Sequence, residues 1–219
     1  ASDSEINPAA LLNDYAAQPD ETKARIQKLL TQLAANYPDD PRSLFAMALL
    51  EWRKGNIDAA KEGLKALFTV DPYHERGTLL ITEIRLQADD PSTFEALLTA
   101  IEVTNSALLR YQYARYLLGR QELENAKAQF DNLVREPQPS ADHLISAALV
   151  DIELSQPASA LVHLDRVLSG RQRINDAYFF RCLALIQVQD TAQALDAFAR
   201  VAPSTNYTRA LREAANLLI

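Results

Sequence analysis

Three histidines and one cysteine are the residues of this sequence best suited to metal binding or covalent catalysis. His74, His143 and His163 lie far apart along the chain, and no His-Glu-x-x-His or Gly-x-Ser-x-Gly motif is present. His163 lies beside Leu161 and Leu164, which predicts a surface or interface histidine. These patterns provide neither a nucleophile–base pair nor a set of metal ligands. We therefore expect no cofactor, no bound metal and no enzymatic activity in this chain.

The composition indicates a folded globular chain. Of the 219 residues, 48% are hydrophobic and 23% are charged, and no apolar run approaches the ~18 residues that a membrane span needs. Because phosphate backbones are bound by basic surfaces, the net charge of −7 predicts no nucleic-acid partner. A single cysteine excludes an internal disulfide framework and is compatible with both cytosol and periplasm. The sequence begins at Ala1 without a methionine or a signal segment, so we expect a processed product.

Helical periodicity runs through the whole sequence. Apolar residues recur three and four positions apart, as in the segments Ala24–Tyr37, Leu44–Arg53, Ala59–Phe68 and Leu123–Val134. No segment alternates between apolar and polar residues as a strand would. Asp40 and Asp90 are each followed by proline, and Ser140 precedes another helical pattern, so each is expected to begin a helix. The predicted fold class is all-α.

The helical pattern repeats with a period of 34 residues. One position of the repeat, which we call the anchor, lies on the second helix of each unit and is held by Ile26, Ala60, Phe94, Ala126, Ala160 and Ala194. Successive anchors are 34 residues apart, except for one step of 32 from Phe94 to Ala126. Large apolar residues follow each anchor after four and seven positions, so they share one helical face. Six units in one register predict stacked helical hairpins, with a shortened junction near Val103–Asn105.

A 34-residue unit of two helices resembles the tetratricopeptide repeat. Four units match its small residue followed four positions later by a large apolar one: Ala60 with Leu64, Ala126 with Phe130, Ala160 with Leu164, and Ala194 with Phe198. Cys182 holds a small-residue position of a first helix, which predicts a buried, inert thiol. The first-helix tryptophan of the pattern is absent, and Phe94 stands where alanine is expected. The resemblance implies a single solenoid domain over residues 1–219, a right-handed superhelix of antiparallel hairpins with a terminal helix at 206–219.

In tetratricopeptide-repeat proteins the first helices line a concave groove. The corresponding positions of this chain predict a partner-binding site made of Arg42, Phe45, Leu49, Trp52, Arg76, Leu79, Tyr111, Arg115, Ile145 and Phe179. These residues lack the lysine and asparagine clamp that some relatives use for a terminal carboxylate, which favours an apolar partner. In the alternative, some of these rows pack between neighbouring hairpins. The charges beside the groove change from basic in early units to acidic in later ones, which fits either an oriented ligand or a solvated face.

Three functions fit this pattern. The first is a non-catalytic scaffold or adaptor that binds a peptide, a helix or a protein; the second is a self-association module; the third is an accessory domain of a larger enzyme. The blocks 111–118 and 207–212 also resemble the long multi-repeat lipoproteins of Gram-negative bacteria. That resemblance implies further repeats, a periplasmic location with outer-membrane association in the full-length protein, and an envelope protease or its substrate as partner. A cytoplasmic location is the alternative.

Overall fold

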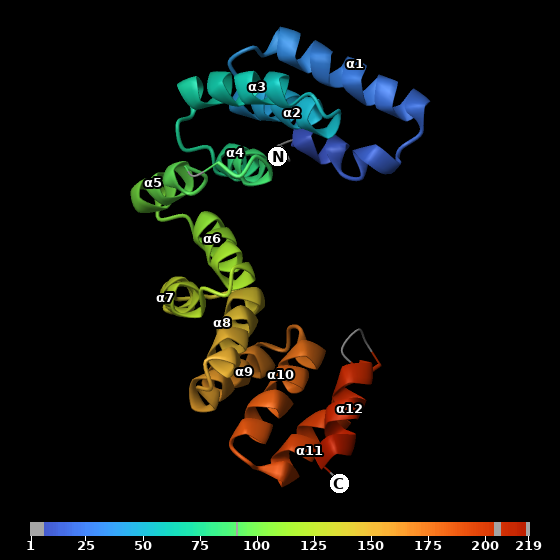
Figure 1. Ribbon diagram of the computed structural model, residues 1–219. Helices are drawn as coiled ribbons and strands as arrows, with labels where there is room; N and C mark the ends of the chain where they lie inside the picture. The colour runs from blue at the N-terminus through green and yellow to red at the C-terminus, as the bar shows by residue number, and fades with distance from the viewer. Residues whose placement is uncertain (1–6, 91, 204–206, 218–219) are drawn as a thin grey trace. The chain divides into compact units, whose positions relative to one another are not determined.

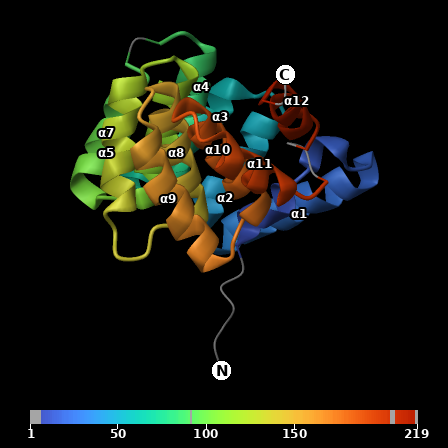
Figure 2. The ribbon, with the colours of Figure 1, turned by 90° about the horizontal axis from the view of Figure 1, so that it is seen from below.

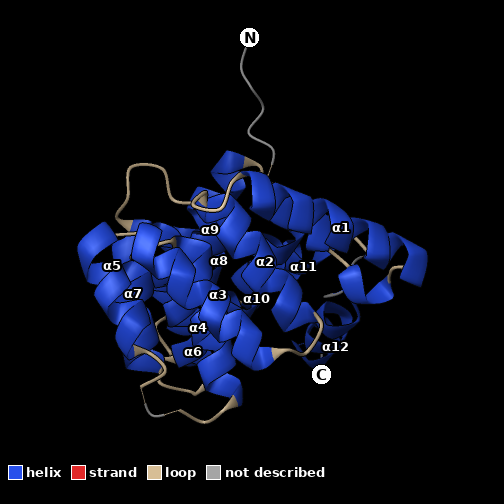
Figure 3. Cartoon of the chain, turned by 90° about the horizontal axis from the view of Figure 1, so that it is seen from above, coloured by secondary structure: helices blue, strands red, loops and turns tan. Residues whose placement is uncertain are grey.

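The computed structural model describes residues 7–90, 92–203 and 207–217, and all regular secondary structure within these ranges is helical (Figure 3). The all-α prediction is therefore confirmed. The chain divides into two compact units, Ala1–Leu109 and Arg110–Ile219, which we call unit 1 and unit 2. The single solenoid domain over residues 1–219 stays a prediction.

Unit 1 alternates between first and second helices of the repeat (Figure 1). Its elements are the 3-10 helices η1 (Pro8–Leu12) and η2 (Tyr15–Ala17), followed by α1 (Asp20–Asn36), α2 (Pro41–Arg53), α3 (Ile57–Val70), α4 (Glu75–Gln87) and α5 (Glu95–Thr104). The second helices α1, α3 and α5 follow the segments that hold the first-helix positions. In the first hairpin these positions form 3-10 helices, and η1 packs against α2.

Unit 2 continues the same alternation. The boundary between the units falls inside α6 (Ala107–Gly119), after which come α7 (Leu123–Val134), α8 (Ala141–Glu153), α9 (Pro157–Gly170), α10 (Ile174–Gln187), α11 (Thr191–Ala199) and α12 (Tyr207–Leu217). From α7 to α12 each helix packs against the next, and α8 to α11 can be followed side by side in Figures 1 and 2. Within the predicted terminal helix 206–219, α12 covers Tyr207–Leu217. Asn206 and residues 218–219 lie outside the described residues.

The repeat pattern builds the core of both units. The four alanine anchors are 0% exposed, because each lies where its own first helix crosses closely: Ala60, Ala126, Ala160 and Ala194. Leu64, Phe130 and Leu164, four positions later, are at most 1% exposed. A comparable close approach occurs at Gly63, where an added Cβ would lie 3.1 Å from the Cβ of Ala48 on α2. Small residues at these positions therefore set the spacing within each hairpin.

Two of the three predicted helix starts are confirmed. Asp40 Oδ1 accepts a hydrogen bond of 2.8 Å from the N–H of Arg42 at the start of α2. Ser140 Oγ accepts a hydrogen bond of 3.1 Å from the N–H of His143 at the start of α8. Each bond satisfies a backbone donor that the first turn of a helix leaves open.

The start of α5 is the main irregularity of unit 1. In the hairpins with alanine anchors the second helix begins three residues before the anchor, as α3 begins at Ile57 before Ala60. Since α5 begins at Glu95, one residue after its anchor, the predicted helix start after Asp90 is wrong. The anchor here is Phe94, which is half-buried where the alanine anchors of the other hairpins are fully buried. The second helix of this hairpin thus starts about one turn later than the others.

Candidate binding surfaces

The first row of the predicted groove lies partly in the core. Phe45 is 5% exposed, and its ring centroid lies 5.2 Å from that of His74, the residue that precedes α4. Ile145 and Phe179 are buried as well, whereas Leu79 is half-buried. At the three buried positions the side chain packs between helices, as in the alternative in which part of this row belongs to the core.

Tyr111 is the half-buried aromatic residue of this row in unit 2. Its ring centroid lies 5.1 Å from that of His143 and 6.0 Å from that of Phe130. Its hydroxyl oxygen lies 3.3 Å from Ser146 Oγ, within hydrogen-bond distance. The guanidinium of Arg115 stands 5.9 Å from the ring centroid, at cation–π distance. Tyr111 is therefore held by α7 and α8, and Arg115 is the exposed group beside it.

On α2 the later positions of the predicted groove reach the surface. Leu49 and Trp52 are half-buried, and both pack against the core of unit 1. The guanidinium of the exposed Arg53 lies 4.9 Å from the centroid of the Trp52 ring. This places a large aromatic ring and a stacked cation together at a partly solvated site.

The two predicted rim arginines of unit 1 are both exposed and engaged. Arg42 forms a two-pronged ion pair with Asp40, with Nη2 at 2.8 Å from Oδ2 and Nε at 3.1 Å from Oδ1. This side-chain hydrogen bond lowers the pKa of Asp40. The guanidinium of Arg76 lies 5.4 Å from the ring centroid of Phe45. Arg42 thus belongs to a helix cap, and Arg76 covers a core aromatic residue.

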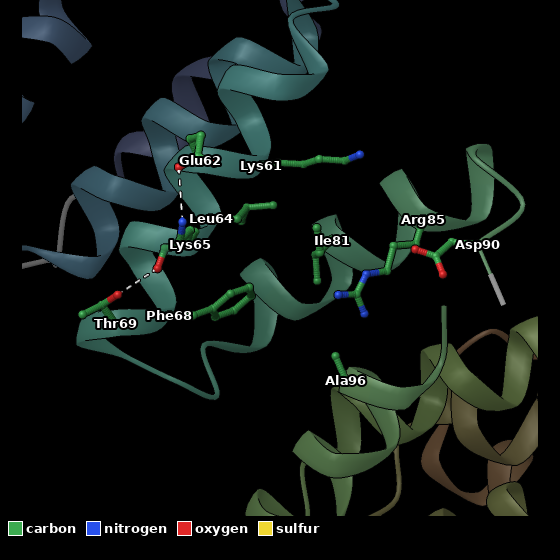
Figure 4. Close-up of a pocket in the computed structure, with 10 residues that line it drawn as sticks. All are labelled: Lys61, Glu62, Leu64, Lys65, Phe68, Thr69, Ile81, Arg85, Asp90 and Ala96. Atoms are coloured by element: carbon green, nitrogen blue, oxygen red, sulfur yellow. Dashed lines mark hydrogen bonds and ion pairs between the residues drawn. The ribbon is translucent and has the colours of Figure 1, made fainter. Parts of the chain in front are cut away.

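A cavity of about 590 Å³ lies away from these rows, where α3 faces α4 and the start of α5 (Figure 4). Its lining is Lys61, Glu62, Leu64, Lys65, Phe68, Thr69, Ile81, Arg85, Asp90 and Ala96. In Figure 4 the Arg85 side chain extends from α4 into the space between Ile81 and Ala96. Sequence reasoning missed this cavity, because its lining comes from three helices and depends on how they pack.

A second feature that sequence reasoning missed is a buried polar cluster in unit 2. Asp151 on α8 is 0% exposed, and its Oδ1 accepts a hydrogen bond of 2.5 Å from Lys127 Nζ on α7. Lys127 Nζ also lies 3.4 Å from Asp131 Oδ1. On the other side, His163 Nε2 on α9 lies 3.5 Å from Asp151 Oδ2. Three helices thus converge on one buried carboxylate.

The titration of this cluster follows from burial and charge. Burial is the largest single influence on the pKa of Lys127 and lowers it, but the hydrogen bonds and negative charges of Asp151 and Asp131 together outweigh burial, so this pKa is raised. Burial lowers the pKa of His163, with the positive charges of Lys127 and Arg166 acting in the same direction. The expected state at neutral pH is a Lys127–Asp151 ion pair beside a neutral imidazole. His163 lies between α8 and α9 with its side chain 13% exposed, which agrees with the predicted surface or interface histidine.

The thiol of Cys182 is 0% exposed, as the sequence predicts. Burial raises its pKa to about 12, so the thiol stays protonated and unreactive at neutral pH. Within the described ranges, no group of three or more His, Cys, Asp or Glu side chains could hold a metal ion. No described helix is long and apolar enough to cross a membrane.

Neither a protein-family model nor a curated protein matches this sequence, whereas solved structures do. The yeast Tom70 structure superposes with a TM-score of 0.70 at 13% identity, covering 96% of this chain and 46% of that one. PilW, a widely conserved type IV pilus biogenesis factor, superposes with a TM-score of 0.58 at 16% identity, covering 81% and 86%. A tetratricopeptide repeat protein from Parabacteroides merdae superposes with a TM-score of 0.53 at 16% identity, covering 98% and 85%.

Identities this low establish a shared fold and nothing finer. The similarity extends over nearly the whole chain for two of these structures, and it agrees with the 34-residue period and the buried small anchors. The helical hairpins described above therefore have the fold of tetratricopeptide-repeat proteins.

Proposed function

We propose that this protein is a non-catalytic scaffold that binds a protein or peptide partner through the exposed face of its first helices. In unit 1 the contact surface consists of Leu49, Trp52 and Leu79, with Arg53 beside it. In unit 2 the corresponding contact is Tyr111 with Arg115. Phe45, a buried member of the predicted groove, belongs to the core against which Leu49 and Trp52 pack.

The observation that carries this proposal is the half-buried Trp52 with Arg53 4.9 Å from its ring. Binding energy at protein interfaces concentrates in a few large side chains, among which tryptophan, tyrosine and arginine are enriched. A ring that is already fixed by the core loses little conformational entropy when a partner covers it. The unreactive thiol of Cys182 and the fold itself favour binding over catalysis.

Capture of partners by the immobilised protein tests this proposal. Trp52→Ala should lose the partners that the wild-type chain retains, with an affinity loss of about thirtyfold, or 2 kcal/mol. Tyr37→Ala is the matched control, because Tyr37 is 57% exposed at the end of α1 and lies outside the first-helix face. Both variants must keep their helical signal and melting temperature. Equal retention of partners by Trp52→Ala and the wild type would refute the proposal.

Finer aspects of the proposal rest on the resemblance to multi-repeat lipoproteins. We propose a periplasmic, outer-membrane-associated protein whose partner is an envelope protease or its substrate, with the two units forming one solenoid domain. Fractionation of cells that produce the natural full-length protein would test the location. Light scattering of the purified chain tests the competing self-association function, which requires a mass that rises with concentration in the absence of any partner.

A further inference from the structure

The helix α4 begins at a histidine cap. His74 precedes the helix, and its Nδ1 accepts a hydrogen bond of 3.0 Å from the N–H of Gly77 in the first turn. Gly77 is buried, and a buried N–H that loses its acceptor destabilises the folded state. The next N–H, that of Thr78, donates to the backbone carbonyl of His74 at 2.9 Å. The imidazole of His74 therefore supplies an acceptor that the first turn of α4 lacks.

The acceptor atom of this cap can be protonated. A neutral imidazole carries one N–H, so an accepting Nδ1 requires that the proton lies on Nε2. Protonation of Nδ1 makes both ring nitrogens donors, and the new N–H then faces the N–H of Gly77. The same step places a positive charge at the N-terminus of α4, where the helix dipole is itself positive. One proton on His74 thus removes the hydrogen bond and adds a repulsion.

Three other helix caps of this chain use oxygen atoms as acceptors. Asp40 and Ser140 cap α2 and α8, and Asp190 Oδ1 accepts a hydrogen bond of 3.0 Å from the N–H of Gln193 at the start of α11. A hydroxyl oxygen accepts at any pH, and the ordinary pKa of an aspartate is about 3.9. These caps therefore persist between pH 5 and pH 8, the range in which histidine changes its charge.

The groups around His74 come from α2, the end of α3 and α4. Phe45 on α2 packs against the imidazole, Asp71 directly follows α3, and Glu75 and Arg76 lie in the first turn of α4. Burial is the largest influence on the pKa of His74 and lowers it, and Arg76 acts in the same direction, whereas Asp71 and Glu75 oppose them. Because the net pKa lies below the ordinary 6.5, the cap is intact above pH 6.5 and is lost as the pH falls below it.

We propose that His74 is a pH-sensitive cap whose protonation opens the first turn of α4. This turn carries Arg76, whose guanidinium lies 5.4 Å from the ring centroid of Phe45, and it is followed by Leu79 of the unit 1 contact surface. Opening the turn in acid removes Arg76 from a core aromatic ring and loosens one side of that surface. The consequence for a partner rests on the proposed function, whereas the opening itself does not.

Nuclear magnetic resonance of the full chain tests the cap without any partner. At pH 7.5 the imidazole nitrogen signals of His74 should show an unprotonated Nδ1. Between pH 7.5 and pH 5 the amide proton resonance of Gly77 should titrate with the same midpoint as the imidazole. The hydrogen-exchange protection of that amide should fall about fivefold, the factor that an ordinary N-cap contributes. The amides of Arg42 and Gln193, held by aspartate caps, are the internal references and should keep their protection.

Two substitutions at His74 separate the cap from its titration. Asparagine is a good N-cap residue that does not titrate, so His74→Asn should retain the protection of Gly77 at pH 7.5 and lose its pH dependence. His74→Ala should show about fivefold lower protection at pH 7.5. His143→Asn is the matched control, because His143 also lies against an aromatic ring, that of Tyr111, but is itself capped by Ser140. It should leave the titration of Gly77 unchanged. Melting temperatures at pH 7.5 verify that each variant is folded.

The proposal is overturned if Nδ1 of His74 carries a proton at pH 7.5, or if His74 stays neutral down to pH 5. It is also overturned if His74 titrates without a response of the Gly77 amide, or if His74→Asn keeps the pH dependence. Parallel loss of protection at Arg42 and Gln193 would indicate global unfolding and would overturn it too. Trp52→Ala should not change the titration, so a failure here is distinguishable from a failure of the first-helix proposal.

Discussion

The second helix of one hairpin packs closely against the first helix of the next hairpin in unit 2, whereas the same junction in unit 1 borders a cavity. In unit 2 the lysine after the anchor of α7 meets a buried aspartate of α8, and the two helices pack extensively. In unit 1 the corresponding lysine of α3 faces an arginine of α4, and these helices pack less extensively beside a cavity of about 590 Å³. One backbone pattern therefore accommodates both a closed core and an open cavity, and the two junctions differ in the charges at two positions and in where the next helix begins.

The largest expected effect comes from giving unit 2 the charges of unit 1. Asp151→Arg would place a second cation at a site where the carboxylate is 0% exposed, and the half-buried Lys127 would keep only the longer contact with Asp131. Breaking a buried pair costs about 3–5 kcal/mol of unfolding free energy. Urea unfolding followed by circular dichroism measures this loss. A variant as stable as the wild type would show that the ion pair does not close the junction.

A smaller effect is expected from the glycine that lets α4 approach α3 in unit 1. A Cβ added at Gly77 would lie 2.7 Å from Leu67 Cδ2 and 3.2 Å from Phe68 Cε1. Gly77→Ala should therefore destabilise the protein by about 1–3 kcal/mol through overpacking, despite the better helix propensity of alanine. Gly63→Ala is the milder comparison, with a nearest contact of 3.1 Å. Thermal melting that ranks the two variants in the opposite order would contradict this account of the packing.

Giving unit 1 the charges of unit 2 should have a modest stabilising effect. Arg85→Asp replaces a pair of like charges by a Lys61–Asp pair at a partly solvated site, where such pairs contribute about 0.2–1 kcal/mol, and the loss of the attraction between Asp90 and Arg85 takes away part of that gain. The gain should shrink when salt is added, because exposed charges are screened. Melting temperatures at low and high salt measure it. A fall in stability that salt does not change would mean that Arg85 has a packing role in the cavity.

The smallest expected effect is a pH dependence, to which the unit 2 cluster contributes. Burial lowers the pKa of His74, His143 and His163 below the ordinary 6.5, so the unfolded chain binds protons more readily than the folded one. Stability contributed by these neutral histidines is present above pH 6.5 and is lost as the pH falls below it. Melting temperature should decrease from pH 7 to pH 5. His163→Gln should reduce that decrease, and an unchanged slope would argue against its role.

The charges that face His163 set the sign of this effect. Lys127 and Asp131 come from α7, Asp151 from α8, and Arg166 from the same helix as the histidine. Asp151 and Asp131 favour protonation, whereas burial and the two cations oppose it, and burial is the largest of these influences. Asp151→Asn should therefore lower the pKa of His163 further. Titration of the imidazole by NMR measures this shift directly.

The sequence by itself determined the elements of this protein and their order. The 34-residue period, the buried alanine anchors and the helix caps at Asp40 and Ser140 all depend on residues a few positions apart, which local helical geometry relates directly. The buried, unreactive Cys182 also follows from its small-residue position. Such features could be predicted because a helix fixes which side chains share a face.

Only the tertiary structure decided which surfaces are closed and which are open. Phe45 and Phe179 share a repeat row with the half-buried Tyr111, yet they are buried because neighbouring helices cover them. The ion pair between Lys127 and Asp151 joins residues that are 24 positions apart, and the cavity beside Arg85 is lined by residues from α3, α4 and α5. Packing between hairpins depends on how neighbouring side chains fit and on their charges. The period of a single helix does not contain that information.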